Sequence, residues 1–125
     1  MSSYVVYILR SEVNKDLMYC GMSINYITRL KQHNGELAGG GQYTSNNRPW
    51  KIAAIIPVSS KEEALKVEWW TKAKNYPFSE QGKIPTCDAV TRRVYLIIQS
   101  MKRHHLTNIK FFDEDFVNCY KNMLS

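Results

Sequence analysis

Residues 4–23 read YVVYILRSEVNKDLMYCGMS, and this stretch decides the fold. Tyr4–Leu9 is β-branched and aromatic, and both of its alternating faces are apolar or aromatic, which predicts a central strand covered on two sides. Ser11–Asp16 is polar and predicts a hairpin loop, after which Leu17–Ser23 predicts a second strand. The chain is therefore expected to begin with a β-hairpin.

The second predicted strand has two chemically different faces. Alternation places Met18, Cys20 and Met22 on one face, and Tyr19 with Gly21 on the other. Tyr19 thus points away from the sulfur-containing face, and Gly21 is expected to leave open space beside it.

The remaining segments predict one further strand and four helices. They are a helix from the N-cap Asn25 to about Asn34, a strand over Trp50–Val58, and helices over Lys61 to about Lys74, Asp88 to about His104, and Asp113–Leu124. Gly35 suits a left-handed end of the first helix, Gly39–Gly41 makes a flexible connection, and Asn75–Pro85 interrupts regular structure. The order β-β-α-β-α-α-α indicates a small α+β domain.

The chain of 125 residues carries 17 Lys and Arg against 11 Asp and Glu, a formal net charge of +6. Its length fits one domain, and the basic excess is spread over both halves of the chain rather than gathered in one tail. A basic folded surface favours a polyanionic partner such as nucleic acid, and an ordinary basic protein is the alternative.

The three cysteines, Cys20, Cys87 and Cys119, are odd in number and lack the spacing of a disulfide framework or a zinc site. They predict buried thiols in a reducing compartment. The N-terminus shows no signal-peptide pattern, and no apolar run approaches the roughly 18 residues that cross a membrane. We therefore expect a soluble intracellular protein with no membrane partner.

Glu68 is a candidate metal ligand. On its predicted helix it follows Ala64 and Leu65 by four and three positions, on the face that those residues are expected to bury. A carboxylate there is costly unless it is paired or binds a metal. A partly exposed Glu68, or one paired with Lys72, is the alternative.

Arg29, His33, Tyr7 and Tyr19 complete the set of candidate catalytic residues. Arg29 and His33 are four positions apart and share a helical face, where the guanidinium suits a phosphate oxygen. His33 is expected to bond the same phosphate or to orient Arg29. A phenol has a pKa of about 10 and accepts a proton at neutral pH only where a nearby cation lowers that pKa. Packing or solvation is an alternative explanation for each residue alone.

In their order and spacing these residues resemble the GIY-YIG nuclease superfamily, over about residues 4–74. The first motif reads Val5-Val6-Tyr7 and the second reads Tyr19-Cys20-Gly21, so that Val5-Val6 replaces Gly-Ile and Cys20 replaces Ile. The family's arginine, histidine and metal-binding glutamate correspond to Arg29, His33 and Glu68.

The resemblance implies an α+β fold in which a small three-stranded antiparallel sheet is flanked by helices. It places a nuclease core at residues 1–75 and extra C-terminal helices at 76–125, packed on the core as one compact domain.

Within the superfamily, the chain is most similar to the nuclease domain of the Slx-type structure-selective endonucleases. The residues that support this are His33-Asn34-Gly35, Gly39-Gly40-Gly41, Thr44-Ser45, Pro49-Trp50, Ala64-Leu65 and Glu68-Trp69-Trp70. Those enzymes carry a C-terminal zinc-binding RING-like domain, which we expect this chain to lack, and the use of their scaffold protein partner stays open.

The resemblance implies hydrolysis of phosphodiester bonds in DNA, with branched molecules such as flaps and four-way junctions as substrates. Glu68 would bind one Mg²⁺ or Mn²⁺, Tyr19 with support from Tyr7 would take a proton from water, and Arg29 and His33 would stabilise the phosphate. The predicted DNA contacts are Gly21, Tyr43, Thr44, Arg48 and Lys72, of which Tyr43 and Thr44 are equally explained by packing.

Two other functions compete with this prediction. A catalytically inactive DNA-binding module of the same fold would keep the basic charge and the altered motifs. A protein-interaction domain would use Trp50, Trp69, Trp70 and the aromatic C-terminal region, although these tryptophans are expected to lie in the core.

Overall fold

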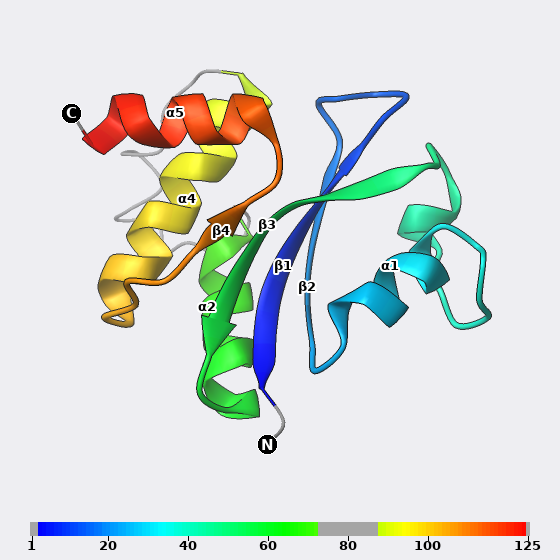
Figure 1. Ribbon diagram of the computed structural model, residues 1–125, viewed down its shortest axis with the longest axis horizontal. Coiled ribbons are helices and arrows are strands. Elements are labelled where there is room, and N and C mark those ends of the chain that lie inside the picture. The colour runs from blue at the N-terminus through cyan, green and yellow to red at the C-terminus, as the bar shows by residue number, and fades with distance from the viewer. Residues whose placement is uncertain (1–2, 73–87, 125) are drawn as a thin grey trace.

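The computed structural model describes residues 3–72 and 88–124 (Figure 1). Its elements, in chain order, are β1 (Tyr4–Ser11), β2 (Met18–Ser23), α1 (Tyr26–His33), a 3₁₀ turn η1 (Tyr43–Ser45), β3 (Trp50–Val58), α2 (Lys61–Thr71), α4 (Ala89–Arg103), β4 (Lys110–Phe111) and α5 (Glu114–Leu124). The predicted α+β class, with helices flanking an antiparallel sheet, is confirmed. The domain boundary after residue 75, Cys87 and the interruption over Asn75–Pro85 fall outside the described residues.

The sheet is built around β1, which pairs antiparallel with both β2 and β3 in the order β2-β1-β3-β4. All residues from Val5 to Ser11 are buried, as a central strand with two apolar faces requires. The prediction of three strands is wrong, because β4 adds a fourth by pairing with Ala54 and Ile55 of β3. Two residues are too few to show strand periodicity, so the sequence carried no sign of β4.

The sheet separates two layers of the molecule. On one side, Val6 and Ile8 of β1 join a single apolar core with side chains of α2, α4 and α5, among them Val67, Val94, Ile97 and Phe116. On the other side lie α1 and η1, which contact Tyr7 and Tyr19 (Figure 1). No helix within the described ranges has the length and apolar character that crossing a bilayer requires.

The helices begin where the sequence predicts. The side chains of Asn25, Ser60 and Asp88 each accept a hydrogen bond from the backbone N–H of the residue three positions later. Each therefore satisfies a free N–H group of the first helical turn. Gly35 closes α1 with a φ of +79°, which confirms the left-handed end. Helix α2 is described as far as Thr71, and the last residues of its predicted range lie outside the described part.

The tryptophans do not share one environment. Trp50 is buried, as expected, and its indole N–H donates to the carbonyl of Thr44. The prediction of a core position is wrong for Trp69, which is 45% exposed. Trp70 is half-buried, and the guanidinium carbon of Arg103 lies 3.6 Å from its ring centroid. Trp69 and Trp70 lie in the last turn of α2.

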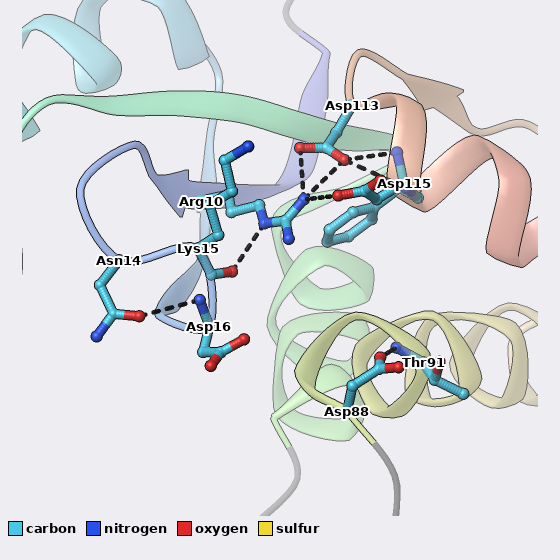
Figure 2. Close-up of polar contacts among 9 residues, drawn as sticks. Arg10, Asn14, Lys15, Asp16, Asp88, Thr91, Asp113 and Asp115 are labelled. Carbon is cyan, nitrogen blue, oxygen red and sulfur yellow. Dashed lines mark hydrogen bonds and ion pairs between the residues drawn. The ribbon is translucent and has the colours of Figure 1, made fainter.

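A buried ion pair ties α5 to the central strand. Arg10 of β1 is 5% exposed, and its Nη1 lies 3.0 Å from both carboxylate oxygens of Asp113 and 2.9 Å from Oδ2 of Asp115 (Figure 2). Arg10 Nε donates to the carbonyl of Lys15, and Asp113 Oδ1 accepts from the N–H groups of Asp115 and Phe116. Asp113 therefore neutralises Arg10 and caps α5 at the same time.

Replacement of Asp113 by Ala is expected to lower the free energy of unfolding by about 3 kcal/mol or more, because a buried guanidinium loses its main partner. The matched control is Asp115→Ala, which removes a carboxylate that bonds the same nitrogen but is 60% exposed. We expect the control to cost no more than about 1 kcal/mol. Urea unfolding of the two variants measures the difference, and equal losses would contradict the assignment.

Candidate active site

The two motif tyrosines lie side by side on the α1 face of the sheet. Tyr7 of β1 is opposite Gly21 of β2, and Tyr19 of β2 is opposite Leu9 of β1. The rings of Tyr7 and Tyr19 meet edge to face, with centroids 6.3 Å apart. The prediction that Tyr19 points away from the sulfur-containing face is confirmed, because Met18 and Cys20 belong to the core on the other side.

His33 joins these strands to α1 and η1. Its Nε2 lies 2.9 Å from Tyr7 Oη, its Nδ1 lies 2.7 Å from Thr44 Oγ1, and its ring centroid lies 4.7 Å from that of Tyr19. Thr44 Oγ1 donates to the carbonyl of Gly41, which leaves it to accept from Nδ1–H. The Nε2 atom of the neutral imidazole then accepts a hydrogen bond from the Tyr7 hydroxyl. Tyr7, Tyr19, His33 and Thr44 are called the tyrosine–histidine cluster below.

Burial holds this cluster in its neutral form. His33 is fully buried, and desolvation, helped by the charges of Arg29 and Arg48, lowers the pKa of its imidazole to about 4. Desolvation also raises the pKa of Tyr7 to about 12, although the nearby Arg29 opposes the rise. Tyr7 is 1% exposed, whereas Tyr19 is half-buried and reaches solvent. Of the two phenols, Tyr19 is the one that a water molecule can approach.

Gly21 is the position that lets Tyr7 reach His33. A Cβ added there would lie 2.5 Å from Tyr7 Oη and 2.7 Å from Tyr7 Cζ. The prediction that Gly21 leaves open space is therefore wrong, because the phenol ring of Tyr7 fills that space. The ring approaches β2 so closely that only a residue without a side chain fits opposite it.

Arg29 is fixed at the rim of the cluster. Its Nη1 donates to Gln32 Oε1 at 2.6 Å and to the carbonyl of Gly39 at 3.0 Å. The glycine run, predicted as a flexible connection, packs here on α1, and a Cβ on Gly40 would collide with the carbonyl oxygen of Gln32. Two bonds to one nitrogen orient the planar guanidinium before any ligand arrives.

The predicted DNA contacts divide into exposed and buried residues. Tyr43 is 52% exposed, and its hydroxyl donates to the carbonyl of Met18. Arg48 is exposed, and its Nε donates to the carbonyl of His33. Thr44 is fully buried and bonded to His33, which agrees with the alternative explanation of packing. The sequence did not distinguish it from Tyr43, since the 3₁₀ turn that separates their directions is only three residues long.

Glu68 approaches the site from the opposite face of the sheet. It lies on α2, its side chain is 20% exposed, and its Oε1 is 3.4 Å from Lys72 Nζ, which confirms the predicted alternative of partial exposure with pairing. The prediction that Leu65 is buried with Ala64 is wrong, since Leu65 is 48% exposed while Ala64 and Val67 are buried. Glu68 is thus at the border of the buried face rather than within it.

Helix α2, which carries Glu68, packs against β2 on the face opposite Tyr19. Burial raises the pKa of the Cys20 thiol to about 12, and Glu68 adds to the rise while Arg93 and Lys72 oppose it. Cys20 lies between Tyr19 and Gly21 in β2, and β2 is the edge strand of the described sheet. Tyr19 and the helix that carries Glu68 therefore lie on opposite faces of the same edge strand.

Asn34 is a supporting residue that the sequence reasoning missed as such. Its Nδ2 donates to the carbonyl of Trp50 at 2.8 Å, and its Oδ1 accepts from the Trp50 N–H at 2.6 Å. This pair of bonds fixes the end of α1, and therefore His33, against the start of β3. Asn34 belongs to the His33-Asn34-Gly35 stretch that supports the family resemblance, and this was the sequence feature that could have indicated its role.

Residues 3–81, more than half of the chain, match the GIY-YIG catalytic domain. The chain belongs to the GIY-YIG family. The matched range includes both tyrosine motifs, Arg29, His33 and Glu68, so the structure shows where this GIY-YIG chain places each of them.

Three relatives of this GIY-YIG chain carry the name structure-specific endonuclease subunit SLX1. The one from Podospora anserina is 46% identical over 69 residues, which cover 53% of this chain and 20% of the relative. Those from Ajellomyces capsulatus and Schizosaccharomyces pombe are 34% identical over 90 residues and 33% identical over 103 residues, covering 69% and 79% of this chain. The chain spans only 21% and 36% of these two relatives.

GIY-YIG nucleases generally depend on a divalent metal. Among residues 3–72 and 88–124, no three or more His, Cys, Asp or Glu side chains gather as a ready-made metal site. Glu68, the predicted metal ligand, offers a hard carboxylate oxygen on α2. This fits a Mg²⁺-type ion, which keeps several waters and takes one or two carboxylates together with substrate phosphates.

Gly21→Ala is expected to lower the free energy of unfolding by about 1–3 kcal/mol, because the new methyl group forces Tyr7 away from His33. The matched control is Gly41→Ala, where an added Cβ meets no atom within 4 Å. We expect the control to change stability by no more than about 0.5 kcal/mol. Urea unfolding of both variants provides the measurement, and a Gly21→Ala protein as stable as wild type would contradict the packing described.

The low pKa of His33 predicts a loss of stability in acid. The folded imidazole titrates at about 4 and the unfolded one at about 6.5, so acidification below pH 6.5 protonates only the unfolded chain. We expect His33 to account for about 2 kcal/mol of the stability lost between pH 7 and pH 5.

The difference between wild type and His33→Gln isolates this contribution in urea unfolding at the two pH values. The Gln variant should show a shallower pH dependence, whereas His105→Asn, which changes an exposed histidine, should keep the wild-type slope. Parallel slopes for wild type and His33→Gln would show that His33 is not held neutral.

Proposed function

We propose that the chain is a metal-dependent DNA endonuclease that hydrolyses phosphodiester bonds, with branched DNA as its preferred substrate. The observation that carries the proposal is the tyrosine–histidine cluster beside Arg29 in a chain of the GIY-YIG family. Phosphodiester hydrolysis needs a group that accepts the proton of water and a cation that stabilises the phosphate. Tyr19 and Arg29, on the α1 face of the sheet, supply these two groups. The net charge of +6 suits a polyanionic substrate.

Tyr19 is the residue that takes the proton from the attacking water. Tyr7 is the less suitable base, because its pKa is raised to about 12 and its hydroxyl proton is engaged by His33 Nε2. The Tyr19 ring is partly open to solvent and packs against both Tyr7 and His33. A cation beside the bound phosphate would favour the phenolate form of Tyr19 during the reaction.

Arg29 and His33 have different roles. Arg29 presents a pre-oriented guanidinium at the rim of the cluster, where it can stabilise negative charge on the phosphate. His33 is buried, and both of its ring nitrogens are engaged, by Tyr7 and by Thr44. We therefore assign His33 to positioning Tyr7 and the helix that carries Arg29, rather than to a direct phosphate contact.

Glu68 would hold the metal, either Mg²⁺ or Mn²⁺, at the open edge of β2. The metal supplies a positive charge that activates water and offsets charge on the phosphate. One carboxylate makes a weak site, so binding is expected to tighten when a DNA phosphate joins it. The pair between Glu68 and Lys72 at 3.4 Å is partly exposed and therefore weak enough to be exchanged.

The preference for branched DNA rests on the relatives, which are named as structure-specific endonuclease subunits. The word subunit also supports a partner protein for this chain. Tyr43 and Arg48 flank the cluster on the same side and are the exposed candidates for backbone contacts.

The test is a cleavage assay on duplex, single-stranded, flap and four-way-junction DNA with Mg²⁺ or Mn²⁺. Wild type should cut the branched substrates faster than the duplex. Glu68→Gln, which keeps the shape and removes the charge, should abolish cleavage, and Tyr19→Phe should slow it by about 100-fold or more. The controls are Glu62→Gln, which changes another glutamate of α2, and Tyr26→Phe, which changes a tyrosine of α1 outside the site; both should cut like wild type.

Each other result has a definite meaning. Cleavage that survives in Glu68→Gln would point to contamination and overturn the proposal. Salt-sensitive DNA binding without cleavage in any metal would identify the alternative, an inactive DNA-binding module of the same fold. Equal rates on all four substrates would keep the nuclease and remove the preference for branches.

A further inference from the structure

The last turn of α2 carries Glu68 and is held from outside the helix. The carbonyl of Thr71 accepts a hydrogen bond from Arg93 Nη1 at 2.7 Å. The carbonyl of Val67 accepts from Ser100 Oγ at 3.2 Å and from Thr71 Oγ1 at 2.6 Å. Two carbonyls that flank Glu68 in the chain are therefore fixed by side-chain donors.

Both external donors come from α4, which lies beyond the matched GIY-YIG range of residues 3–81. Arg93 and Ser100 are seven positions apart, or two helical turns, and so share the face of α4 that packs on α2 (Figure 1). Ser100 is fully buried. The α4 helix thus contributes two polar bonds to an interface whose other members, such as Val67, Val94 and Ile97, are apolar.

The hydrogen bond from Arg93 to the end of α2 requires partial desolvation of a guanidinium, which is unfavourable. Desolvation lowers the pKa of its guanidinium, which shows that the charge is partly withdrawn from water. A carbonyl at a helix C-terminus can instead be satisfied by water or by a glycine cap, without moving a charge into the protein. The guanidinium does offer a charge-assisted bond that also matches the negative end of the helix dipole.

The position of this bond connects it to the site. Both bonds fix the turn of α2 that carries Glu68, and α2 packs against β2. Glu68 is a single carboxylate that must meet a metal and a phosphate at the edge of that strand. A shift of the last turn of α2 would move this oxygen donor, and sites of this kind tolerate displacements of only about 0.5 Å.

We propose that Arg93, together with Ser100, is a positioning residue for the metal site: it fixes the last turn of α2 and thereby the placement of the Glu68 carboxylate. The inference rests on the proposed function, because it assumes that Glu68 binds a divalent ion. It makes the C-terminal helix α4 a working part of the site, rather than only a cover for the sheet.

The experiment measures Mn²⁺ binding directly, by electron paramagnetic resonance of free Mn²⁺, in the full chain with and without a four-way junction. Arg93→Gln should raise the Mn²⁺ concentration at half-saturation by roughly 10-fold, as loss of a supporting contact does at metal sites. Arg93→Lys, which keeps a charged donor, should recover part of the loss. The matched control is Arg92→Gln, which removes the exposed neighbouring charge and should bind Mn²⁺ like wild type.

A second variant separates positioning from folding. Ser100→Ala removes one bond and little volume, so it should fold and should weaken Mn²⁺ binding in the same direction by a smaller factor. Thermal unfolding of each variant, read beside the Mn²⁺ titration, identifies a purely structural role: a lowered Tm with an unchanged half-saturation in the folded protein would overturn the inference.

Failure of the inference and failure of the proposed function give different results. If Glu68→Gln weakens Mn²⁺ binding and Arg93→Gln does not, Arg93 has no positioning role while the metal site stands. If Mn²⁺ binding depends on Glu68 and Arg93 but no DNA is cut, the nuclease proposal fails and the positioning role is retained. If Glu68→Gln binds Mn²⁺ like wild type, the assignment of the metal to Glu68 and the inference both fall.

Discussion

The hydrogen bond between Tyr7 and His33 is the contact on which the α1 side of the molecule depends. Both side chains are buried, and a buried polar group without a partner costs on the order of 1–3 kcal/mol. The bond forms only because Gly21 has no side chain to exclude the phenol ring. It also requires Thr44 Oγ1 to accept a hydrogen bond from the Nδ1–H of His33, so the 3₁₀ turn must pack against α1. One polar contact thus dictates the residue opposite it on β2 and the path of the loop that follows α1.

The other half of the site is placed by different physics. Glu68 is brought to the edge of β2 by the apolar core under the sheet, where Ala64 and Val67 of α2 are buried against strands and α4. Within residues 3–72 and 88–124, no hydrogen bond connects Glu68 to the tyrosine–histidine cluster. The candidate site is therefore composed of the tyrosine–histidine cluster on one face of the sheet and a carboxylate on the other, and β1 and β2 contribute to both faces.

This division explains what the sequence could predict. Three of the four strands, the helix starts and the capping residue Asn25 follow from local periodicity and polarity. The site residues were found as a set, because their order along the chain resembles a family. Their environments were not: Gly21 was expected to leave space that Tyr7 fills, Leu65 was expected inside, and Thr44 was left open between a DNA contact and packing. Each error concerns which neighbour a side chain meets across the sheet or across a turn, and a single sequence does not contain that information. Arg10 and Asp113 were missed for the same reason, since they meet across 103 positions.

The buried residues of the site are neutral, and its charged residues lie at partly exposed positions. The buried wall is neutral, because desolvation keeps a proton on Tyr7 and keeps an extra proton off His33. The charged groups, Arg29 and the pair of Glu68 with Lys72, lie at partly exposed positions where water screens them. A phosphodiester group, which carries one negative charge, would therefore meet partly exposed charges at the rim and a fixed, uncharged interior. Arg29, Glu68 and Lys72 can therefore exchange their partners for a ligand without disturbing the hydrogen bond between Tyr7 and His33. That bond is the contact on which the α1 side of the fold depends.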